Sequence, residues 1–105
     1  MTIKHTFFVG LNDKDAKTQI IDTLSAARIV ERVFCSHDCD GATISGGRGV
    51  YRHNDGTVIC EETVIVTVFE FGAPVPVAEI CADLKALLNQ ESIAVESVET
   101  NSALY

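Results

Sequence analysis

The feature that most constrains the fold of this chain is a long hairpin at its centre. The segment Asn54-Asp55-Gly56 has the composition of a tight turn, because these residues tolerate the positive φ angles that such turns require. Residues 42–53 before it predict a strand interrupted by glycines, and residues 58–71 after it predict a long strand rich in β-branched side chains. The chain is therefore expected to contain two adjacent antiparallel strands.

A strand and a helix are predicted ahead of this hairpin. Residues 3–9 show the two-residue alternation of a strand. Residues 12–15 offer helix-capping side chains, and apolar residues then recur at helical spacing over 16–30. Residues 31–34 either extend this helix or form a short strand, and residues 35–41 are typical of a polar loop.

A helix and a strand are predicted after the hairpin. Residues 72–76 break the long strand, and Pro76 suits the first turn of a helix, where its missing N–H costs nothing. Apolar residues then repeat at helical spacing over 77–88, residues 93–98 predict a last strand, and residues 100–105 form a tail.

The resulting order, β-α-β-β-α-β, predicts an α+β fold. It is the order of the ferredoxin-like two-layer sandwich, in which both helices cover one face of a four-stranded antiparallel sheet. A chain of 105 residues fits one hydrophobic core, and no linker or low-complexity segment divides it. Residues 1–105 are therefore expected to form a single ferredoxin-like domain.

The strand predicted at 58–71 is apolar on both faces. Its even positions carry Val64, Val66 and Val68, and its odd positions carry Ile65, Phe69 and Phe71. Only one sheet face meets the helices in a two-layer fold, so we expect a second subunit to cover the other face in a homo-oligomer. The alternative is that Phe69 and Phe71 pack under the C-terminal tail.

The chain is acidic, with a formal net charge of −7, and the acidity is concentrated in its second half. Residues 1–53 carry seven basic and six acidic side chains, whereas residues 54–105 carry one basic and nine acidic ones. Such a charge repels nucleic acids and anionic membranes, and it attracts a basic protein partner. The alternative is that the acids only keep the protein soluble.

The cysteines and termini favour a reducing compartment. No apolar run has the length of a membrane span, and no basic region precedes an apolar stretch at the N-terminus, so a cytoplasmic protein is expected. The four cysteines are expected to be free thiols. The spacing Cys35-x-His37-x-Cys39 contains zinc-type ligands but differs from common zinc motifs, and nothing marks an oxyanion hole beside it. We therefore expect no metal, no cofactor and no catalytic residue.

A small basic, glycine-rich segment stands out against this acidity. Its candidate ligand-binding residues are Gly46, Gly47, Arg48, Arg52 and His53. Exposed backbone amides and guanidinium groups hold phosphates and carboxylates. The segment is neither a Walker loop nor a Rossmann fingerprint, since it lacks Gly-Lys-Ser/Thr and does not open a helix. The alternative is that the glycines only allow a bulge or twist in the strand.

The run from Gly41 to Tyr51, which follows a strand-helix unit, resembles the corresponding stretch of P-II-type signalling proteins. That family consists of ferredoxin-like trimers that bind nucleotides and small anions between subunits, so the resemblance implies a sensor with its site at a subunit cleft. The chain also resembles a family of uncharacterised bacterial domains through Gly49-Val50-Tyr51-Arg52, Asp55-Gly56 and Glu62-Thr63. It departs from the P-II pattern at its tight central turn, where those proteins have a long protruding loop.

In size and acidity the chain is similar to phage-borne anti-CRISPR inhibitors. Some of these present carboxylates to the basic channels in which Cas nucleases hold nucleic acid. We therefore expect a non-catalytic binding protein, an inhibitor carried by a mobile element that blocks a basic nucleic-acid-handling nuclease. The P-II-like sensor is the alternative. The candidate partner-binding residues are Glu61, Glu62, Glu70, Glu79, Asp83, Glu96 and Glu99.

Overall fold

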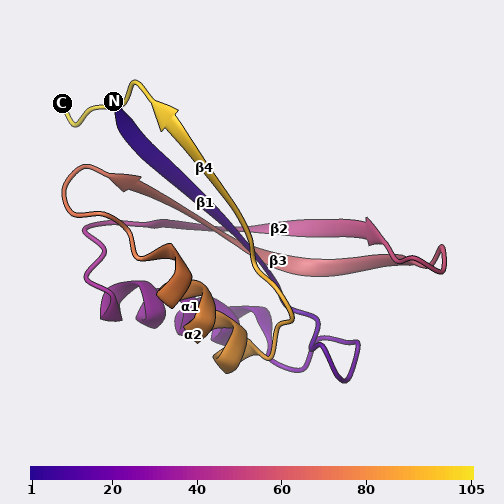
Figure 1. Cartoon of the computed structure of the whole chain (residues 1–105). Helices are drawn as coiled ribbons and strands as arrows, with labels where there is room; N and C mark the ends of the chain where they lie inside the picture. The colour runs from indigo at the N-terminus through magenta and orange to yellow at the C-terminus, as the bar shows by residue number, and fades with distance from the viewer.

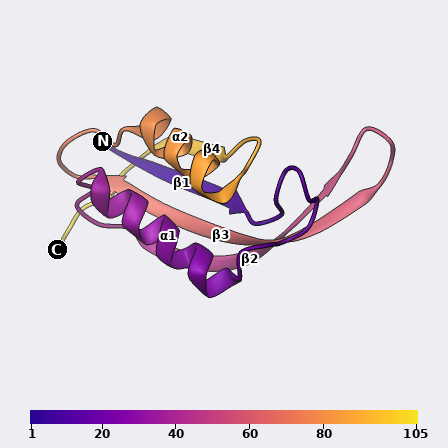
Figure 2. The same ribbon diagram turned by 90° about the horizontal axis from the view of Figure 1, so that it is seen from below.

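The predicted elements form in the predicted order in the computed structural model, which describes residues 1–105. Neighbouring strands pair antiparallel in the order β2-β3-β1-β4, and both helices lie on one side of this sheet (Figure 1). Figure 2 looks at the sheet from the helix side, with α1 and α2 in front of it. The predicted ferredoxin-like α+β fold is thereby confirmed. The elements are β1 (Thr2–Gly10), α1 (Thr23–Ser36), β2 (Thr43–Arg52), β3 (Val58–Glu70), α2 (Val77–Leu88) and β4 (Ala94–Thr100).

The hydrophobic core lies between the sheet and the helices. Phe7 of β1 meets Phe34 of α1 edge-on, with 4.9 Å between the ring centroids and 84° between the ring planes, a geometry that aromatic pairs favour. Ile80 and Leu84 of α2 are fully buried because residues four apart share one helix face. Neither helix has the length and apolar character needed to cross a membrane.

Helix α1 begins at Thr23, later than the sequence predicts. Asp22 caps it, because its carboxylate accepts hydrogen bonds from the Ser25 N–H at 2.9 Å and from the Ser25 hydroxyl at 2.7 Å. Residues 31–34 are helical, so the helix continues to Ser36 and the short-strand alternative is wrong.

The helix start predicted near residues 12–15 is therefore wrong. The Asp13 carboxylate accepts hydrogen bonds from the Asp15 and Ala16 N–H groups at 3.0 and 2.9 Å, and the Asp13 carbonyl accepts the Lys17 N–H at 2.9 Å. Lys17 adopts a left-handed φ of 62°. These contacts close a turn instead of opening a helix, because a residue with a left-handed φ at position 17 cannot continue a right-handed helix.

The hairpin of β2 and β3 projects beyond the helices as a two-stranded arm, residues 48–62 (Figure 1). It turns at Gly56, whose φ of 89° favours glycine. No helix covers the arm, and Val50 on its helix-side face remains 64% exposed. An isolated two-stranded ribbon is only marginally stable in water. The arm therefore presents apolar surface that packing within the chain leaves uncovered.

The face of the sheet opposite the helices is also open. Strand register aligns Phe69, Lys4 and Val98 in one row across this open face. Phe8 lies on the same face, and both Phe8 and Val98 are exposed. The open face thus carries large apolar side chains that the fold itself does not bury.

The C-terminal tail, residues 101–105, does not remove this exposure. Leu104 and Tyr105 lie in solvent, and Phe71 remains 43% exposed. The Phe71 ring stacks on Phe69 with 5.4 Å between centroids. The tail therefore leaves the Phe71 ring in contact with water.

A half-buried polar contact ties β1 to the loop before α2. His5 Nε2 lies 2.7 Å from Glu70 Oε1, and His5 Nδ1 lies 2.7 Å from the Ser97 hydroxyl. The same Glu70 oxygen accepts the Val75 N–H at 2.8 Å. The hydrogen bond from Val75, followed by the one with His5, lowers the pKa of Glu70, since both favour the charged carboxylate.

This contact makes folding stability depend on pH. Because the pKa of Glu70 is lower in the folded state, its charged form stabilises the fold above the unfolded pKa, and that contribution is lost as the pH falls through the folded pKa. Glu70→Gln should lower the free energy of unfolding at neutral pH by about 1–3 kcal/mol and flatten its decline below about pH 5. Urea titrations across this range measure both effects, and an equally steep decline in the variant would contradict this assignment.

Candidate functional site

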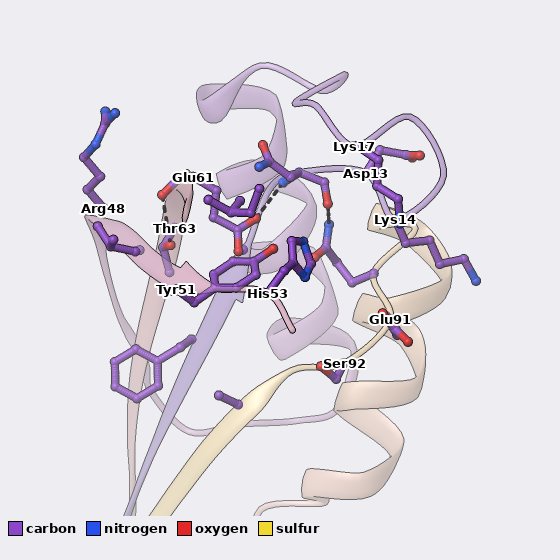
Figure 3. A pocket seen from close by; sticks show the side chains of 18 of the residues that line it. Asp13, Lys14, Lys17, Arg48, Tyr51, His53, Glu61, Thr63, Glu91 and Ser92 are labelled. Atoms are coloured by element: carbon purple, nitrogen blue, oxygen red, sulfur yellow. Dashed lines mark hydrogen bonds between the residues drawn. The ribbon is translucent and has the colours of Figure 1, made fainter. Parts of the chain in front are cut away.

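A cavity of about 550 Å³ lies on the open face at the root of the arm (Figure 3). Its lining comes from the strands, from the loop between β1 and α1, and from the loop between α2 and β4. Small-molecule sites span about 300–1,000 Å³, so the volume suits such a ligand. Its charged lining residues are of both signs: Lys14, Lys17 and Arg48 against Asp13, Glu61 and Glu91.

Glycines open this cavity. Strand register places Gly10 and Gly47 on either side of Thr63, and Gly49 beside Glu61. Alternate residues of a strand share a face, so all three glycines lie on the open face and add no side chains to the floor around Thr63 and Glu61. Bulkier rows on either side form the walls: Ile65, Phe8 and Ala94 on one side, and Tyr51 and Ile59 on the other.

The glycines do not form the bulge that the sequence allowed. β2 and β3 pair in continuous register from Thr43↔Thr67 to Arg52↔Val58. Gly47 belongs to the cavity floor, whereas Gly46 pairs with Val64 on the helix side. Their effect is to remove side chains, not to break the strand.

Glu61 stands at the centre of the floor. Its Oε2 accepts the Asn12 N–H at 2.9 Å, and its carboxylate occupies the space that a Cβ on Gly10 would need. Glu61 forms no ion pair with another side chain. The cavity thus holds a negative charge that suits a positively charged group of a ligand.

Tyr51 forms an aromatic wall beside the Glu61 carboxylate (Figure 3). Burial, and then the negative charges of Glu61 and Glu91, raise the pKa of Tyr51, so the phenol stays neutral and can donate a hydrogen bond. The ring meets His53 edge-on with 5.4 Å between centroids. It is 44% exposed, which leaves a flat surface for a nucleobase or a cation.

The predicted anion-binding residues gather only in part. Arg48 and His53 are among the residues that line the cavity. Strand register nevertheless places Arg48, like Arg52, on the helix-side face of the arm, and the Arg52 Nη1 donates to the Gly56 carbonyl at 3.0 Å. Anion binding by this set stays a prediction.

The predicted partner-binding acids do not share one surface. Three have partners within the chain: Glu62 with Arg48 at 3.5 Å, Glu70 with His5 and Asp83 with His37, both at 2.7 Å. Glu79 and Asp83 belong to α2, whereas Glu96 lies on the open face and Glu99 on the helix side of β4. Binding of a basic partner through these acids stays a prediction.

The segment Cys35-x-His37-x-Cys39 at the end of α1 is not arranged as a metal centre. No three His, Cys, Asp or Glu side chains come together in a way that could hold a metal ion. His37 Nε2 lies 2.7 Å from Asp83 Oδ2. Cys39 packs against the core, and burial raises the pKa of its thiol. All four cysteines are free.

Sequence analysis did not identify Gly10, Asn12 and Tyr51 as parts of a site, and it assigned Glu61 to a partner-binding surface. The sequence contains one indication of the cavity. Gly47 and Gly49 are two residues apart, so both leave the same face of the strand without a side chain. That spacing predicts a hollow but does not say which side chains from β1 and β3 line it.

No protein-family model matches the sequence, and no curated protein is significantly similar to it. Solved structures do share the fold. A phage SAM lyase in complex with S-methyl-5′-thioadenosine matches 93% of this chain and 81% of its own, with 23% identity and a TM-score of 0.68. CutA from Archaeoglobus fulgidus, a periplasmic divalent cation tolerance protein, matches 99% and 88%, with 12% identity and a TM-score of 0.64.

A P-II-like protein is also among the structural neighbours, as the resemblance in the sequence implied. The GlnK–ATP complex of B. subtilis matches 93% of this chain and 83% of its own, with 12% identity and a TM-score of 0.55. At these identities the shared feature is the fold.

Proposed function

We propose that the cavity binds S-adenosylmethionine (SAM) and that the protein cleaves it to S-methyl-5′-thioadenosine and a four-carbon lactone. The observation that carries this proposal is an unpaired carboxylate, Glu61, beside an aromatic wall, Tyr51. SAM offers the complementary groups, a sulfonium cation and an adenine ring. The fold shared with a phage SAM lyase that holds S-methyl-5′-thioadenosine supports it. The proposal departs from the non-catalytic role expected from the sequence.

The adenosine portion is proposed to lie against Tyr51. A base stacked on an aromatic ring gains about 1–3 kcal/mol. The neutral phenol adds a hydrogen-bond donor, and the His53 ring holds the Tyr51 ring in place from the side. This wall binds the substrate and the nucleoside product alike.

The sulfonium is proposed to face Glu61. Two opposite unit charges 4 Å apart attract by about 4 kcal/mol at an effective dielectric constant near 20. The Asn12 N–H holds the carboxylate in place, so the charge is oriented before the ligand arrives. The neutral sulfur of the product lacks this attraction, which favours its release.

The proposed reaction requires no acid, base or nucleophile from the protein. One oxygen of the substrate carboxylate attacks the γ-carbon, the bond from that carbon to sulfur breaks, and its electron pair returns to sulfur. The products are a neutral thioether and a lactone that keeps its ammonium group, and no proton moves. A cation and an anion neutralise each other in this step, so a cavity that excludes water favours it.

We also propose that the site is completed in a homo-oligomer, with the arm of one copy covering the open face of the next. The arm and the open face both carry exposed apolar side chains, among them Val50 and Phe8. Phe8 lines the cavity, so a chain covering this face would also shield the bound ligand from water. The P-II resemblance, which implies a site between subunits, is consistent with this arrangement.

Isothermal titration calorimetry with S-methyl-5′-thioadenosine tests the proposed ligand class. The wild-type protein should bind it, and Tyr51→Ala should weaken binding by about tenfold or more, given about 1–3 kcal/mol per stacked base. Tyr51→Phe keeps the ring and is the matched control. Binding of ATP in preference to the thioadenosine would instead favour the P-II-like sensor, and no binding of either would contradict both functions.

Gly10→Ala tests the position of Glu61. The new methyl group collides with the Glu61 carboxylate, the end of a flexible side chain that can swing out of the floor. We expect little change in melting temperature but at least about a tenfold loss of affinity for SAM analogues that carry a positive charge, the equivalent of about 1.4 kcal/mol. Gly46→Ala, where an added methyl group meets nothing, is the control. Unchanged affinity in Gly10→Ala would show that the Glu61 position does not matter.

A further inference from the structure

The loop between β1 and α1, residues 11–22, brings two lysines to the rim of the cavity (Figure 3). Lys14 and Lys17 both line the cavity, on the side away from Arg48. Neither forms an ion pair, although the chain has a net charge of −7. No lysine in the chain forms an ion pair, so what sets Lys14 and Lys17 apart is their place on the rim of the cavity.

The acids nearest to these lysines in sequence are engaged elsewhere. The Asp13 carboxylate accepts two backbone N–H groups and, at 2.8 Å, the side-chain amide of Asn89. The same amide lies 2.9 Å from Asp15 Oδ2. The hydrogen bond from the Ala16 N–H, followed by the one from the Asn89 amide, lowers the pKa of Asp13, so its carboxylate stays charged and bound to these donors. The two carboxylates therefore hold the loop in place, and neither forms an ion pair with a lysine.

The backbone fixes the loop further. The Lys14 N–H donates to the Asn89 carbonyl at 3.0 Å, and the Gln90 side-chain amide donates to the Asn12 carbonyl at 2.8 Å. Lys17 has a φ of 62°, a region that favours glycine or asparagine. A lysine at such a position, on a loop tied to the end of α2, points to a use for its side chain.

We propose that Lys14 and Lys17 bind the carboxylate of the ligand's amino-acid portion. This rests on the proposed function, since the cavity then matches SAM at three places: the aromatic wall, the Glu61 carboxylate and the lysine rim. An ammonium that holds one carboxylate oxygen leaves the other oxygen free to attack the γ-carbon. The lysines are thus specificity-determining residues that distinguish the intact substrate from the thioadenosine product, which has no carboxylate.

Calorimetry with two ligands tests this assignment. S-adenosylhomocysteine carries the amino-acid carboxylate, and S-methyl-5′-thioadenosine does not. In the double variant Lys14→Gln/Lys17→Asn, in which Asn suits the left-handed φ, affinity for S-adenosylhomocysteine should fall by about tenfold or more, as expected for the loss of charge-assisted hydrogen bonds. Affinity for S-methyl-5′-thioadenosine should change by less than about twofold, the equivalent of about 0.4 kcal/mol.

Arg28→Gln/Lys85→Gln is the control, because it removes the same two charges from α1 and α2, outside the cavity lining. An equal effect of the two double variants on S-adenosylhomocysteine would overturn the assignment, since it would come from net charge alone. Unchanged affinity for S-adenosylhomocysteine in the lysine variant would overturn it while leaving the proposed function intact. Failure of the wild-type protein to bind either ligand would overturn the proposed function, and this assignment with it.

Discussion

Glu61→Gln should reduce the rate of SAM cleavage at low SAM concentration by about tenfold or more, because the sulfonium loses its counter-charge and SAM binds more weakly. The amide oxygen of Gln can still accept the Asn12 N–H, so the side chain keeps its place and only the charge is lost. The rate is measured as formation of S-methyl-5′-thioadenosine by liquid chromatography at SAM concentrations well below KM.

Glu79→Gln is the control for this change. Glu79 is exposed on α2, outside the cavity lining, and its loss removes the same charge from the protein. Equal rates for Glu61→Gln and the wild-type protein would show that the charge of Glu61 does not contribute to the cleavage of SAM. A comparable loss in Glu79→Gln would attribute the effect to overall charge.

The second large effect is expected on assembly. Phe71→Asp/Val98→Asp places two carboxylates on the open face, and burying such a charge in an apolar interface costs several kcal/mol. The wild-type protein should sediment as an oligomer and the variant as a monomer, with cleavage activity lost because water reaches the site. Analytical ultracentrifugation measures the mass directly.

Ile20→Asp provides the comparison for assembly. Ile20 is exposed and lies beside the end of α2, away from the open face. The Ile20→Asp variant should keep the wild-type oligomeric state and the wild-type activity. A wild-type protein that sediments as a monomer, or an open-face variant that stays oligomeric, would show that the open face is not the interface.

The helices and strands whose ends are set by neighbouring residues could be predicted from the sequence. The pattern from Val77 to Leu88 with Pro76 before it predicts α2, which spans those residues in the structure. The central hairpin is also predicted, since Asn54-Asp55-Gly56 is a turn whatever the surrounding fold. Together with two-residue and helical periodicities, these signals suffice for the β-α-β-β-α-β order and hence for the ferredoxin-like fold.

The start of α1 could not be predicted because two Asp residues compete to cap it. Asp13 and Asp22 are both followed by residues that tolerate a helix, and local preference does not separate them. The contact that decides between them is long-range: Asn89, at the end of α2, binds Asp13 and holds residues 13–17 in a turn. A sequence pattern carries no information about that partner.

The candidate site was mostly hidden for the same reason. Gly10, Gly49 and Glu61 come from three strands and meet only through the pairing of β3 with both β1 and β2. A shift of one residue in either pairing would turn Glu61 to the helix side. The proposed reaction also leaves no motif, because the substrate supplies its own nucleophile. A sequence search for paired acids and bases, or for metal ligands, therefore does not detect the candidate site.

Incubation of the purified protein with SAM, without added metal or cofactor, tests the central claim most directly. Mass spectrometry should show S-methyl-5′-thioadenosine and the four-carbon lactone appearing in equal amounts, and Glu61→Gln should form both more slowly at low SAM concentration. SAM that remains intact through prolonged incubation with the oligomeric wild-type protein would contradict the account.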